Sequence, residues 1–364
     1  MIEVAIVGAG LSGLALANTL SLAGCVVHVF EARDRVGGRI GSVTLADGGR
    51  GDLGPTWFWP EHQRRMASLV EHLGLDHLCQ HEHGTHMVQS EAGAEPKLVE
   101  QDDVHANASR LAGGMAVLTD TLAARLPETA LQLEHVLTSV SDQGGHVTLE
   151  FATPSGPQRV ESLVAVFAMP PRLIESSVSF EPSLPPQIRV AMREMPTWMA
   201  AQAKLLAGQR SDFWRQEGRS GTAVAPYPSA VLGEVWDACD EAGHAALAAF
   251  VGLGADQRKQ FASGLPMLAS SQLVQFFGPQ AEPVDCHVQD WATEPLTCAE
   301  LDRMQVADHP TDAPEVLQRP CWQGRIHFCG SETAAYAPGY MEGALEAAGR
   351  VHKALLVWFR RAAA

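Results

Sequence analysis

The sequence predicts an α/β protein in which helices cover a parallel sheet and a second lobe with a mixed sheet is inserted into the first. Three observations predict this fold. Residues 2–7 and 26–30 are apolar runs separated by a glycine cluster and a helical pattern, which is a βαβ opening. Near the C-terminal end of the sequence, a short apolar strand at 326–329 is followed by a helical pattern from Met341, which again pairs a buried strand with a helix. Between them, a proline-rich connection leads into a middle region with strand patterns of its own.

Composition limits the class of protein and its partners. A chain of 364 residues favours two lobes, because single cores rarely grow beyond roughly 250–300 residues. The net charge of −16, with no basic run, argues against nucleic acid and anionic lipid as partners. No apolar stretch reaches the roughly 18–20 residues of a membrane-spanning helix, so we expect no membrane partner. Seven scattered cysteines fit reduced thiols, and a chain that opens directly on a strand favours a cytoplasmic protein.

The elements between the two ends follow from the pattern of apolar residues. A helical segment is expected after Pro60, a polar histidine-rich stretch reaches about Ala108, and a second helix is expected up to Leu126. Strand-like runs occur at residues 131–136, 146–151, 163–168, 202–207 and 247–251. Pro170-Pro171 ends the third of these runs sharply.

The glycine cluster has the spacing of a dinucleotide-binding turn. Gly8, Gly10 and Gly13 match the pattern Gly-x-Gly-x-x-Gly between a strand and a helix. In that setting the glycines permit a tight turn, the approach of a pyrophosphate and close packing of the helix on the strand. The helix N-terminus then offers free N–H groups to phosphates. Glu31 ends the second strand, where its carboxylate can accept hydrogen bonds from both hydroxyls of a ribose.

The residues after Glu31 favour FAD over NAD as the dinucleotide. Residues 31–39 read Glu-Ala-Arg-Asp-Arg-Val-Gly-Gly-Arg. Arg33, Gly38 and Arg39 thereby place a second set of backbone and guanidinium donors where they can reach the same pyrophosphate. Domains that bind only NAD do not need this second set. The alternative is an exposed turn with surface arginines.

With these motifs the sequence resembles the flavin amine oxidase family, which includes monoamine and polyamine oxidases. Matching segments, in the family's order, are residues 51–57, Val136, 168–171, 180–182, Lys204 with 213–214, 290–291, 328–333 and 339–344. The resemblance implies a Rossmann-like FAD-binding domain of the glutathione-reductase/amine-oxidase type with an inserted mixed-sheet substrate domain. The segment between about Leu75 and Gly113 is much shorter than in the eukaryotic members, which implies a reduced substrate lobe.

The resemblance also suggests domain limits and cofactor contacts. We expect the FAD-binding domain at residues 1–65, 111–178 and 294–364, and the substrate-binding domain at residues 66–110 and 179–293. Besides the glycines, acid and arginines above, cofactor contacts are expected at Ser12, Ala32, Gly54, Pro55, Thr56, Trp57, Val136, Met169, Trp291, Gly330, Ser331, Glu332, Tyr340, Met341 and Ala344. The helix that begins at Met341 is expected to face the flavin pyrimidine with its positive end.

By resemblance the reaction is the oxidation of an amine to an imine at the expense of oxygen, with hydride transfer to flavin N5 and release of hydrogen peroxide. Lys204, Tyr340 and Trp291 are the expected catalytic residues. Lys204 lies in an apolar strand pattern, so burial should lower its pKa. The resemblance implies that Lys204 holds a water against flavin N5 and helps the reduced flavin react with oxygen. Tyr340 should form one wall of the aromatic cage around the amine.

Two departures from the family pattern concern the cage and the flavin linkage. The second cage wall falls on Leu301, so the cage is half built, and Tyr336 or Trp57 is a candidate for the missing face. Where the mitochondrial enzymes carry the cysteine that links the flavin, this chain has Glu300. We therefore expect noncovalent FAD.

Two other functions and a metal site are alternatives to this function. A related FAD enzyme that acts on carbon–carbon bonds, such as a desaturase, shares the N-terminal motif, and a flavin-binding sensor without turnover is a third alternative. A histidine-rich segment (residues 72–86, with Cys79) contains metal-ligand types, but its spacing places no clean tetrahedral set on one element, so no metal is expected. The alternation from His81 to Val88 indicates instead a half-exposed strand near the entrance of the active site. The sequence leaves the oligomeric state and the identity of the amine open.

Overall fold

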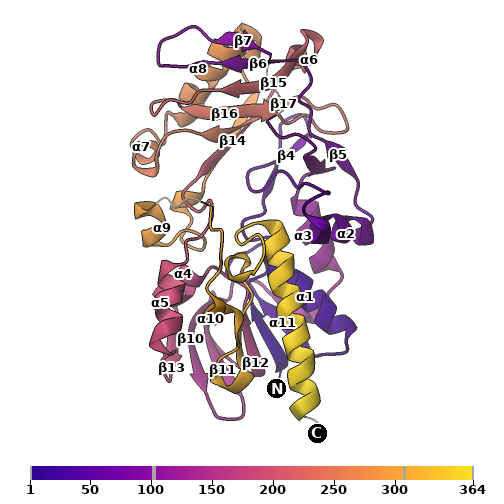
Figure 1. Ribbon diagram of the computed structural model, residues 1–364, viewed down its shortest axis with the longest axis vertical. Coiled ribbons are helices and arrows are strands. Elements are labelled where there is room, and N and C mark those ends of the chain that lie inside the picture. Colours follow the sequence, from indigo (N-terminus) through magenta and orange to yellow (C-terminus); the bar gives the residue numbers. More distant parts are fainter. Residues whose placement is uncertain (1, 101–103, 306–308, 363–364) are drawn as a thin grey trace.

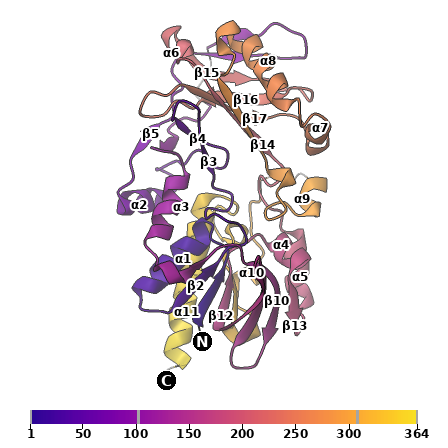
Figure 2. The same ribbon diagram turned by 180° about the vertical axis from the view of Figure 1, so that it is seen from behind.

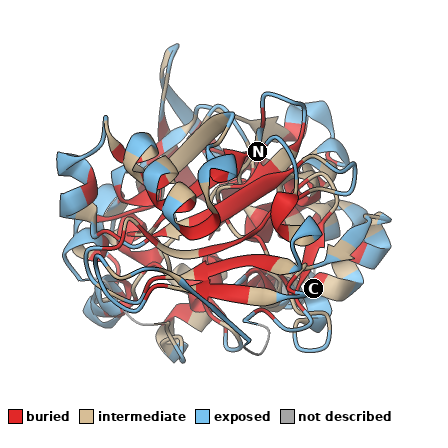
Figure 3. Ribbon diagram, turned by 90° about the horizontal axis from the view of Figure 1, so that it is seen from above, coloured by how far each residue is buried: buried red, intermediate tan, exposed pale blue. Residues whose placement is uncertain are grey.

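The computed structural model describes residues 2–100, 104–305 and 309–362. Two large sheets lie one above the other in the long direction of the molecule (Figure 1). An eight-stranded sheet carries the N-terminal strand and the last helix, and a seven-stranded sheet forms the opposite end. Buried residues concentrate on the strands and on the inward sides of the helices (Figure 3).

The eight-stranded sheet begins with the βαβ unit that the sequence predicts. Its strands are β1 (Ile2–Val7), β2 (Val27–Phe30), β9 (Leu131–Gln132), β10 (Val136–Asp142), β11 (Val147–Thr153), β12 (Gly156–Phe167), β13 (Ser179–Glu181) and β19 (Ile326–Phe328). The order is β13-β10-β11-β12-β1-β2-β9, and β19 pairs with the last residues of β12. Strands β9, β2, β1, β12 and β19 are parallel, whereas β10, β11 and the first half of β12 form an antiparallel meander.

Helices cover both faces of this sheet (Figures 1 and 2). On one face lie α1 (Leu11–Leu22), α2 (Arg64–Leu73), α3 (Ala116–Ala124) and α11 (Met341–Ala362), and on the other lie α4 (Pro171–Ser177), α5 (Pro186–Glu194) and α10 (Glu315–Gln318). Successive side chains of β1 point to opposite faces of the sheet and pack in both cores. Val4 and Ile6 pack with α1 and α11, whereas Ala5 and Val7 pack with α4 and α10. β1 is therefore apolar from Val4 to Val7.

The seven-stranded sheet has the order β18-β14-β17-β16-β15-β6-β7. Its strands are β6 (Thr85–Val88), β7 (Lys97–Val99), β14 (Ala203–Gly208), β15 (Arg219–Val224), β16 (Leu232–Asp237), β17 (Ala246–Val251) and β18 (Asp285–Asp290), and the nearby helices are α6 (Phe213–Gln216), α7 (Ala255–Gln260), α8 (Leu265–Phe277) and α9 (Glu300–Met304). One face packs against α8, with Leu205 of β14 in contact with that core. The opposite face turns toward the eight-stranded sheet and carries Leu206 and Trp236.

Two small antiparallel pairs connect the large sheets: β3 (Ser42–Thr44) with β4 (Arg50–Asp52), and β5 (His77–Cys79) with β8 (Ser109–Leu111). α2 lies within the range that we assigned to the substrate domain, yet its Met66 and Val70 pack in the same core as α1 and α11. The domain limits stay a proposal. Within the described part of the chain, no helix is long and apolar enough to cross a membrane.

Three strand expectations need correction. The single strand at residues 131–136 is two strands, because Glu134 adopts a positive φ of 58° and the chain turns between β9 and β10. β12 starts seven residues before the expected 163, since its polar first half pairs with β11. The alternation at 81–88 forms a strand only from Thr85, and His86 in that strand is buried.

Candidate functional site

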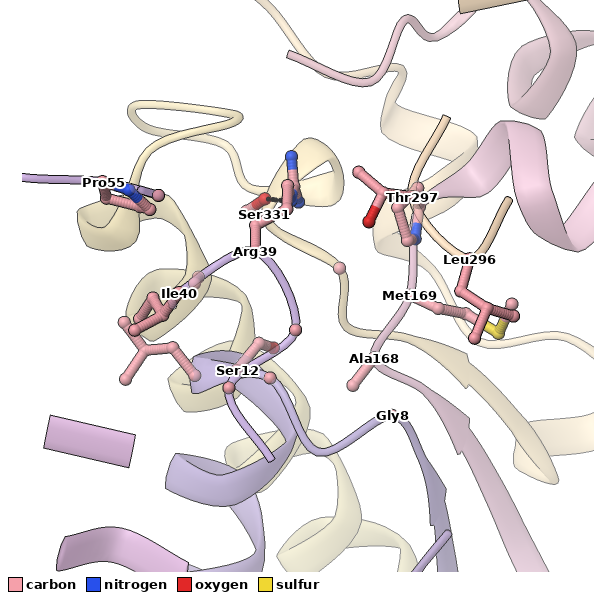
Figure 4. A pocket seen from close by; sticks show the side chains of 18 of the residues that line it. Gly8, Ser12, Arg39, Ile40, Pro55, Ala168, Met169, Leu296, Thr297 and Ser331 are labelled. Carbon is pink, nitrogen blue, oxygen red and sulfur yellow. Dashed lines mark hydrogen bonds between the residues drawn. The ribbon is translucent and has the colours of Figure 1, made fainter. Parts of the chain in front are cut away.

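A cavity of about 540 Å³ runs between the two sheets. At one end its walls are the turn after β1 and the end of β2, and at the other end they are Lys204, Phe250 and Tyr340. Figure 4 shows Gly8, Ser12 and Ala168 on one side of this space and Arg39, Pro55 and Ser331 on another. The site therefore combines residues from both ends of the chain with residues from the middle region.

The β1–α1 turn requires its glycines for three separate reasons. Gly8 has a φ of 107°, and a Cβ there would lie 2.5 Å from the Ala168 carbonyl oxygen. A Cβ on Gly13 would collide with the Gly8 carbonyl oxygen, so α1 can pack on β1 only with glycine there. Gly10 has no atom closer than 3.9 Å to such a Cβ and lines the cavity. The bare surface at Gly10 and the N-terminus of α1 suit a pyrophosphate.

Glu31 lies at the end of β2 and is 4% exposed. One carboxylate oxygen accepts the N–H of Ala9 at 2.7 Å and the other accepts the N–H of Arg33 at 3.0 Å. These bonds fix the side chain at the cavity wall. Because an ionised carboxylate has about four acceptor positions, it keeps the capacity to accept ribose hydroxyls.

Arg39 joins the glycine-rich turn to the C-terminal part of the chain. Its Nη1 donates to Glu332 Oε1 at 2.6 Å, and its Nη2 donates to Ser331 Oγ at 2.9 Å and to Glu332 Oε2 at 3.1 Å. Glu332 is fully buried, so this bidentate pair compensates a carboxylate that has no access to water. Both terminal nitrogens of Arg39 are engaged, and its contact with a pyrophosphate stays a prediction. Arg33 donates to Glu294 and Thr297.

Lys204 lies on the face of β14 that turns toward the cavity. Its register partner on β17 is Phe250, and the next register partner on β16 is Glu234, so the three residues form a row across the sheet. The Lys204 ammonium donates to the Gly54 carbonyl oxygen at 2.6 Å and to Thr56 Oγ1. Burial lowers the pKa of Lys204 to about 8, against the raising effect of the negative charges of Asp52 and Glu234.

Aromatic rings surround this ammonium. Lys204 Nζ lies 5.0 Å from the ring centroid of Trp236, 5.4 Å from that of Phe250 and 5.8 Å from that of Trp57. Rings at this distance attract a cation, which partly offsets its burial. Trp291 closes the same region from β18, and its Nε1 donates to the Leu53 carbonyl oxygen at 2.9 Å.

The two cage candidates have different positions. Tyr340 lines the cavity, and its ring lies 4.5 Å from that of His309. Leu301 lies on α9 and does not line the cavity. Tyr336 is 53% exposed with its hydroxyl near the His62 carbonyl oxygen, so it does not supply the second wall. Trp57 lines the cavity together with Lys204 and Phe250.

The structure gathers nearly all of the sequence-derived site residues at this one cavity. Its walls include Gly8, Gly10, Ser12, Glu31, Ala32, Arg33, Gly38, Arg39, Gly54, Pro55, Thr56, Trp57, Val136, Met169, Lys204, Trp291, Gly330, Ser331, Tyr340, Met341 and Ala344. Gly13 and Glu332 lie behind the wall, where they support the turn and Arg39. The first residues of α11 reach the cavity, so the N-terminus of that helix faces it. This set fits FAD, with glycines where phosphates approach and a helix end toward the ring.

Sequence reasoning missed His105 and its partners. His105 stacks on Trp57 with ring centroids 3.9 Å apart and lies between Glu82 and Glu234. Its segment carries no periodic pattern that could indicate burial.

The structure contains no cluster that could hold a metal ion among residues 2–100, 104–305 and 309–362, since no group of three or more histidine, cysteine or acidic residues there is suited to binding one.

The chain is similar to known proteins over most of its length. A model of the family described as flavin containing amine oxidoreductase matches residues 11–99 and 83–356. A probable flavin-containing monoamine oxidase A of Dictyostelium discoideum is 24% identical over 457 residues, which cover 96% of each chain. Putrescine oxidase of Kocuria rosea is 24% identical over 407 residues, with 81% of this chain and 83% of the relative covered.

Solved structures show the same fold. Putrescine oxidase bound to putrescine superposes with a TM-score of 0.77 at 23% identity, over 98% of this chain and 99% of that one. Cyclohexylamine oxidase from Brevibacterium oxydans superposes with a TM-score of 0.81 at 20% identity, over 99% of both chains. The predicted α/β fold with an inserted mixed sheet is confirmed.

Proposed function

The chain belongs to the family of flavin containing amine oxidoreductases, and from that premise we propose that it oxidises an amine to an imine, with oxygen as final acceptor and hydrogen peroxide as the second product. The cofactor of the family is FAD, which supplies the two-electron acceptor of this reaction at N5 of its ring. The protein's tasks are to hold that ring, to keep water away from it and to orient the amine.

The observation that carries the proposal is the buried ammonium of Lys204. It lies in the cavity wall between the Gly54 carbonyl and three aromatic rings, and burial lowers its pKa to about 8. A lysine in that state can hold a water through one N–H and can change protonation near neutral pH. This supports the role that the family resemblance gives it, a water held beside N5 and help to the reaction with oxygen.

The groups that would hold FAD are distributed along the cavity. The Gly8–Gly13 turn and the N-terminus of α1 would hold the pyrophosphate, Glu31 would accept hydrogen bonds from the ribose, and Val136 would contact the adenine. Arg39 fixes the Ser331–Glu332 segment, which forms the wall near the start of α11. The N-terminus of α11 carries partial positive charge, so it would stabilise negative charge on the bound flavin ring.

The walls near Lys204 suit a neutral amine with an apolar substituent. Tyr340, Phe250 and Trp57 present aromatic surface to the cavity, and Trp291 closes it from the side of β18. Such walls exclude water, and they favour the uncharged amine, whose nitrogen lone pair the reaction requires.

Anaerobic mixing tests this function. The purified yellow protein is mixed without oxygen with a panel of primary and secondary amines and amino acids, and the flavin absorbance is followed. Bleaching by an amine, followed by recovery of the colour and stoichiometric peroxide when air is admitted, is the expected result. Bleaching by a polyene and by no amine would assign the carbon–carbon chemistry instead, and a protein that nothing bleaches would be no amine oxidase.

A further inference from the structure

His105 is a buried histidine that the proposed reaction does not use. Its ring lies between two carboxylates: Nδ1 is hydrogen-bonded to Glu82 Oε1 at 3.0 Å, and Nε2 lies 3.0 Å from Glu234 Oε1 as an ion-pair contact without hydrogen-bond geometry. The backbone N–H of His105 also donates to both oxygens of Glu82, at 2.8 and 2.9 Å. The ring therefore has one fixed orientation.

The face of this fixed ring lies against Trp57. The two centroids are 3.9 Å apart and the planes differ by 23°, which is a stacked pair. Two further contacts hold Trp57: its Nε1 donates to Gln80 Oε1 at 2.8 Å, and its ring packs against Trp236 at 4.7 Å. Gln80 in turn donates to the Asp237 carbonyl oxygen. Trp57 is thus restrained by a hydrogen bond at its indole N–H and by its contacts with His105 and Trp236 while it lines the cavity.

The chain lacks the second wall at the position where the family pattern puts one, since Leu301 lies on α9 away from the cavity. Trp57 lines the cavity near Lys204 and Phe250, and Tyr340 lines the same cavity. A large rigid ring binds an apolar substituent well only if its own rotamer is already fixed.

We propose that Trp57 is the second aromatic wall of the amine pocket and that His105, through Glu82 and Glu234, is the positioning residue that fixes it. This proposal rests on the proposed amine oxidation for its ligand. Burial disfavours the charged imidazole, but the nearby carboxylates of Glu234 and Glu82 outweigh burial and raise the pKa of His105 to about 9. The ring is therefore a cation between two carboxylates at neutral pH, and the array loosens when it loses its proton.

Binding to the FAD-loaded protein, measured without turnover, tests the wall. The oxidised protein is titrated without oxygen with benzyl alcohol, a neutral probe, through the perturbation of the flavin spectrum. We expect Trp57→Leu to raise Kd about tenfold and Trp57→Phe, which keeps an aromatic face, to raise it less than threefold. Equal affinity of wild type and Trp57→Leu would refute the wall. Because this titration needs no reaction, a protein that binds the probe but oxidises no amine contradicts the proposed function and not this inference.

The positioning role of His105 has a pH signature. Glu82 and Glu234 face the imidazole, and Lys204 faces Glu234 across β17 and titrates about one unit lower, near pH 8. In the wild type the benzyl alcohol Kd should rise as pH increases through about 9, as the imidazolium is lost. In His105→Gln it should be high already at pH 7.5, about three- to tenfold above wild type, and lack the step near 9. His244→Gln is the matched control, since His244 pairs with Asp240 outside the cavity and should leave Kd unchanged.

Two results would contradict the positioning role of His105. A His105→Gln protein with wild-type Kd and the same step near pH 9 would show that the ring does not position Trp57. If His105→Gln fails to take up FAD, Glu234→Gln replaces it, because this variant loosens one side of the histidine only. A wild-type profile without the step near 9 would overturn the positioning role in either case.

Discussion

Lys204 is one of four lysines in the chain, and it is 4% exposed. Replacement by methionine keeps the length of the side chain and removes the ammonium that donates to Gly54 and Thr56. We expect Lys204→Met to slow the reoxidation of the reduced flavin by oxygen about 10² fold, because a fixed donor is lost where negative charge develops on oxygen. Anaerobic reduction by the amine should change much less. Stopped-flow absorbance measures both rates, and equal losses in the two would contradict the role.

The pKa of Lys204 sets a pH dependence for the same step. With a pKa lowered to about 8, the side chain is charged below that pH and neutral above it. A positive charge favours the transfer of electrons to oxygen, so the reoxidation rate constant should fall as pH rises through about 8. Reoxidation measured between pH 6 and 10 should show this fall in the wild type and a flat profile in Lys204→Met. A reoxidation rate constant that rises with pH would contradict the role given to the charged form of Lys204.

Glu300 bears on how the cofactor is held. It stands where a linking cysteine would be needed, and the nearest thiol, Cys298, is buried with its pKa raised to about 11 by burial. A thiol in that state is a poor nucleophile. We therefore expect acid precipitation to release all of the yellow colour into the supernatant. Colour that stays with the precipitated chain would show a covalent bond.

Glu342 couples the start of α11 to the start of α2. Its buried carboxylate accepts the backbone N–H groups of Arg65 and Met66, at 3.2 and 3.0 Å, and the Arg65 guanidinium at 3.0 Å. It thus satisfies free N–H groups of α2 and complements the positive end of that helix. Because the first residues of α11 also line the cavity, the coupling fixes the helix end that faces the cavity.

Replacement of Glu342 by glutamine keeps an acceptor oxygen and removes the charge. We expect Glu342→Gln to lower the free energy of unfolding by about 1–3 kcal/mol, the usual cost of a weakened buried charge-assisted network. Glu71→Gln, on the same helix but exposed, should stay within about 0.5 kcal/mol of wild type. Urea denaturation of the FAD-free proteins gives both values, and similar losses in the two variants would show that the buried contacts do not matter.

Local patterns allowed some strands to be predicted and left others undetectable. β1 and β14 are largely apolar in the sequence because most of their residues are buried, with Glu3 and Lys204 as the charged exceptions. β15 and β16 each contain a glycine, and β18 is mostly polar and half-buried along its whole length. β15 pairs with β6 and β18 pairs with β14, which are distant in sequence, and this pairing supports their strand conformation. No local signal encodes that pairing.

The site divides in the same way. The turn at Gly8–Gly13 and the Lys204 strand are local motifs, so their chemistry could be inferred before their positions were known. Arg39 was expected beside a phosphate, and its partner Glu332 could be identified only once the two ends of the chain were brought together. His105 meets Trp57 and Glu234 from three separate segments. A contact of this kind depends on the tertiary fold alone.

The whole molecule is built around the cavity between its two sheets. Wall residues come from the βαβ unit, from β14 and β17 of the other sheet, and from α11 at the end of the chain. Side-chain contacts such as that of Lys204 with the Gly54 carbonyl oxygen occur at the wall of this cavity. A ligand that contacts both sides adds its binding free energy to the native state only.

We therefore expect FAD to raise the melting temperature of the whole chain in one transition. At a free FAD concentration of about 100 times Kd the native state gains about 2.7 kcal/mol, which for a chain of this size corresponds to a few degrees. Differential scanning calorimetry of the FAD-free protein with added FAD measures this shift, with riboflavin as the control that lacks the pyrophosphate and adenine. Because Gly10 and Glu31 are the proposed contacts of the pyrophosphate and the adenosine ribose, riboflavin should shift the transition less. Equal shifts with both ligands would mean that the β1–α1 turn contributes nothing to cofactor binding, and the placement of FAD along the cavity would be wrong.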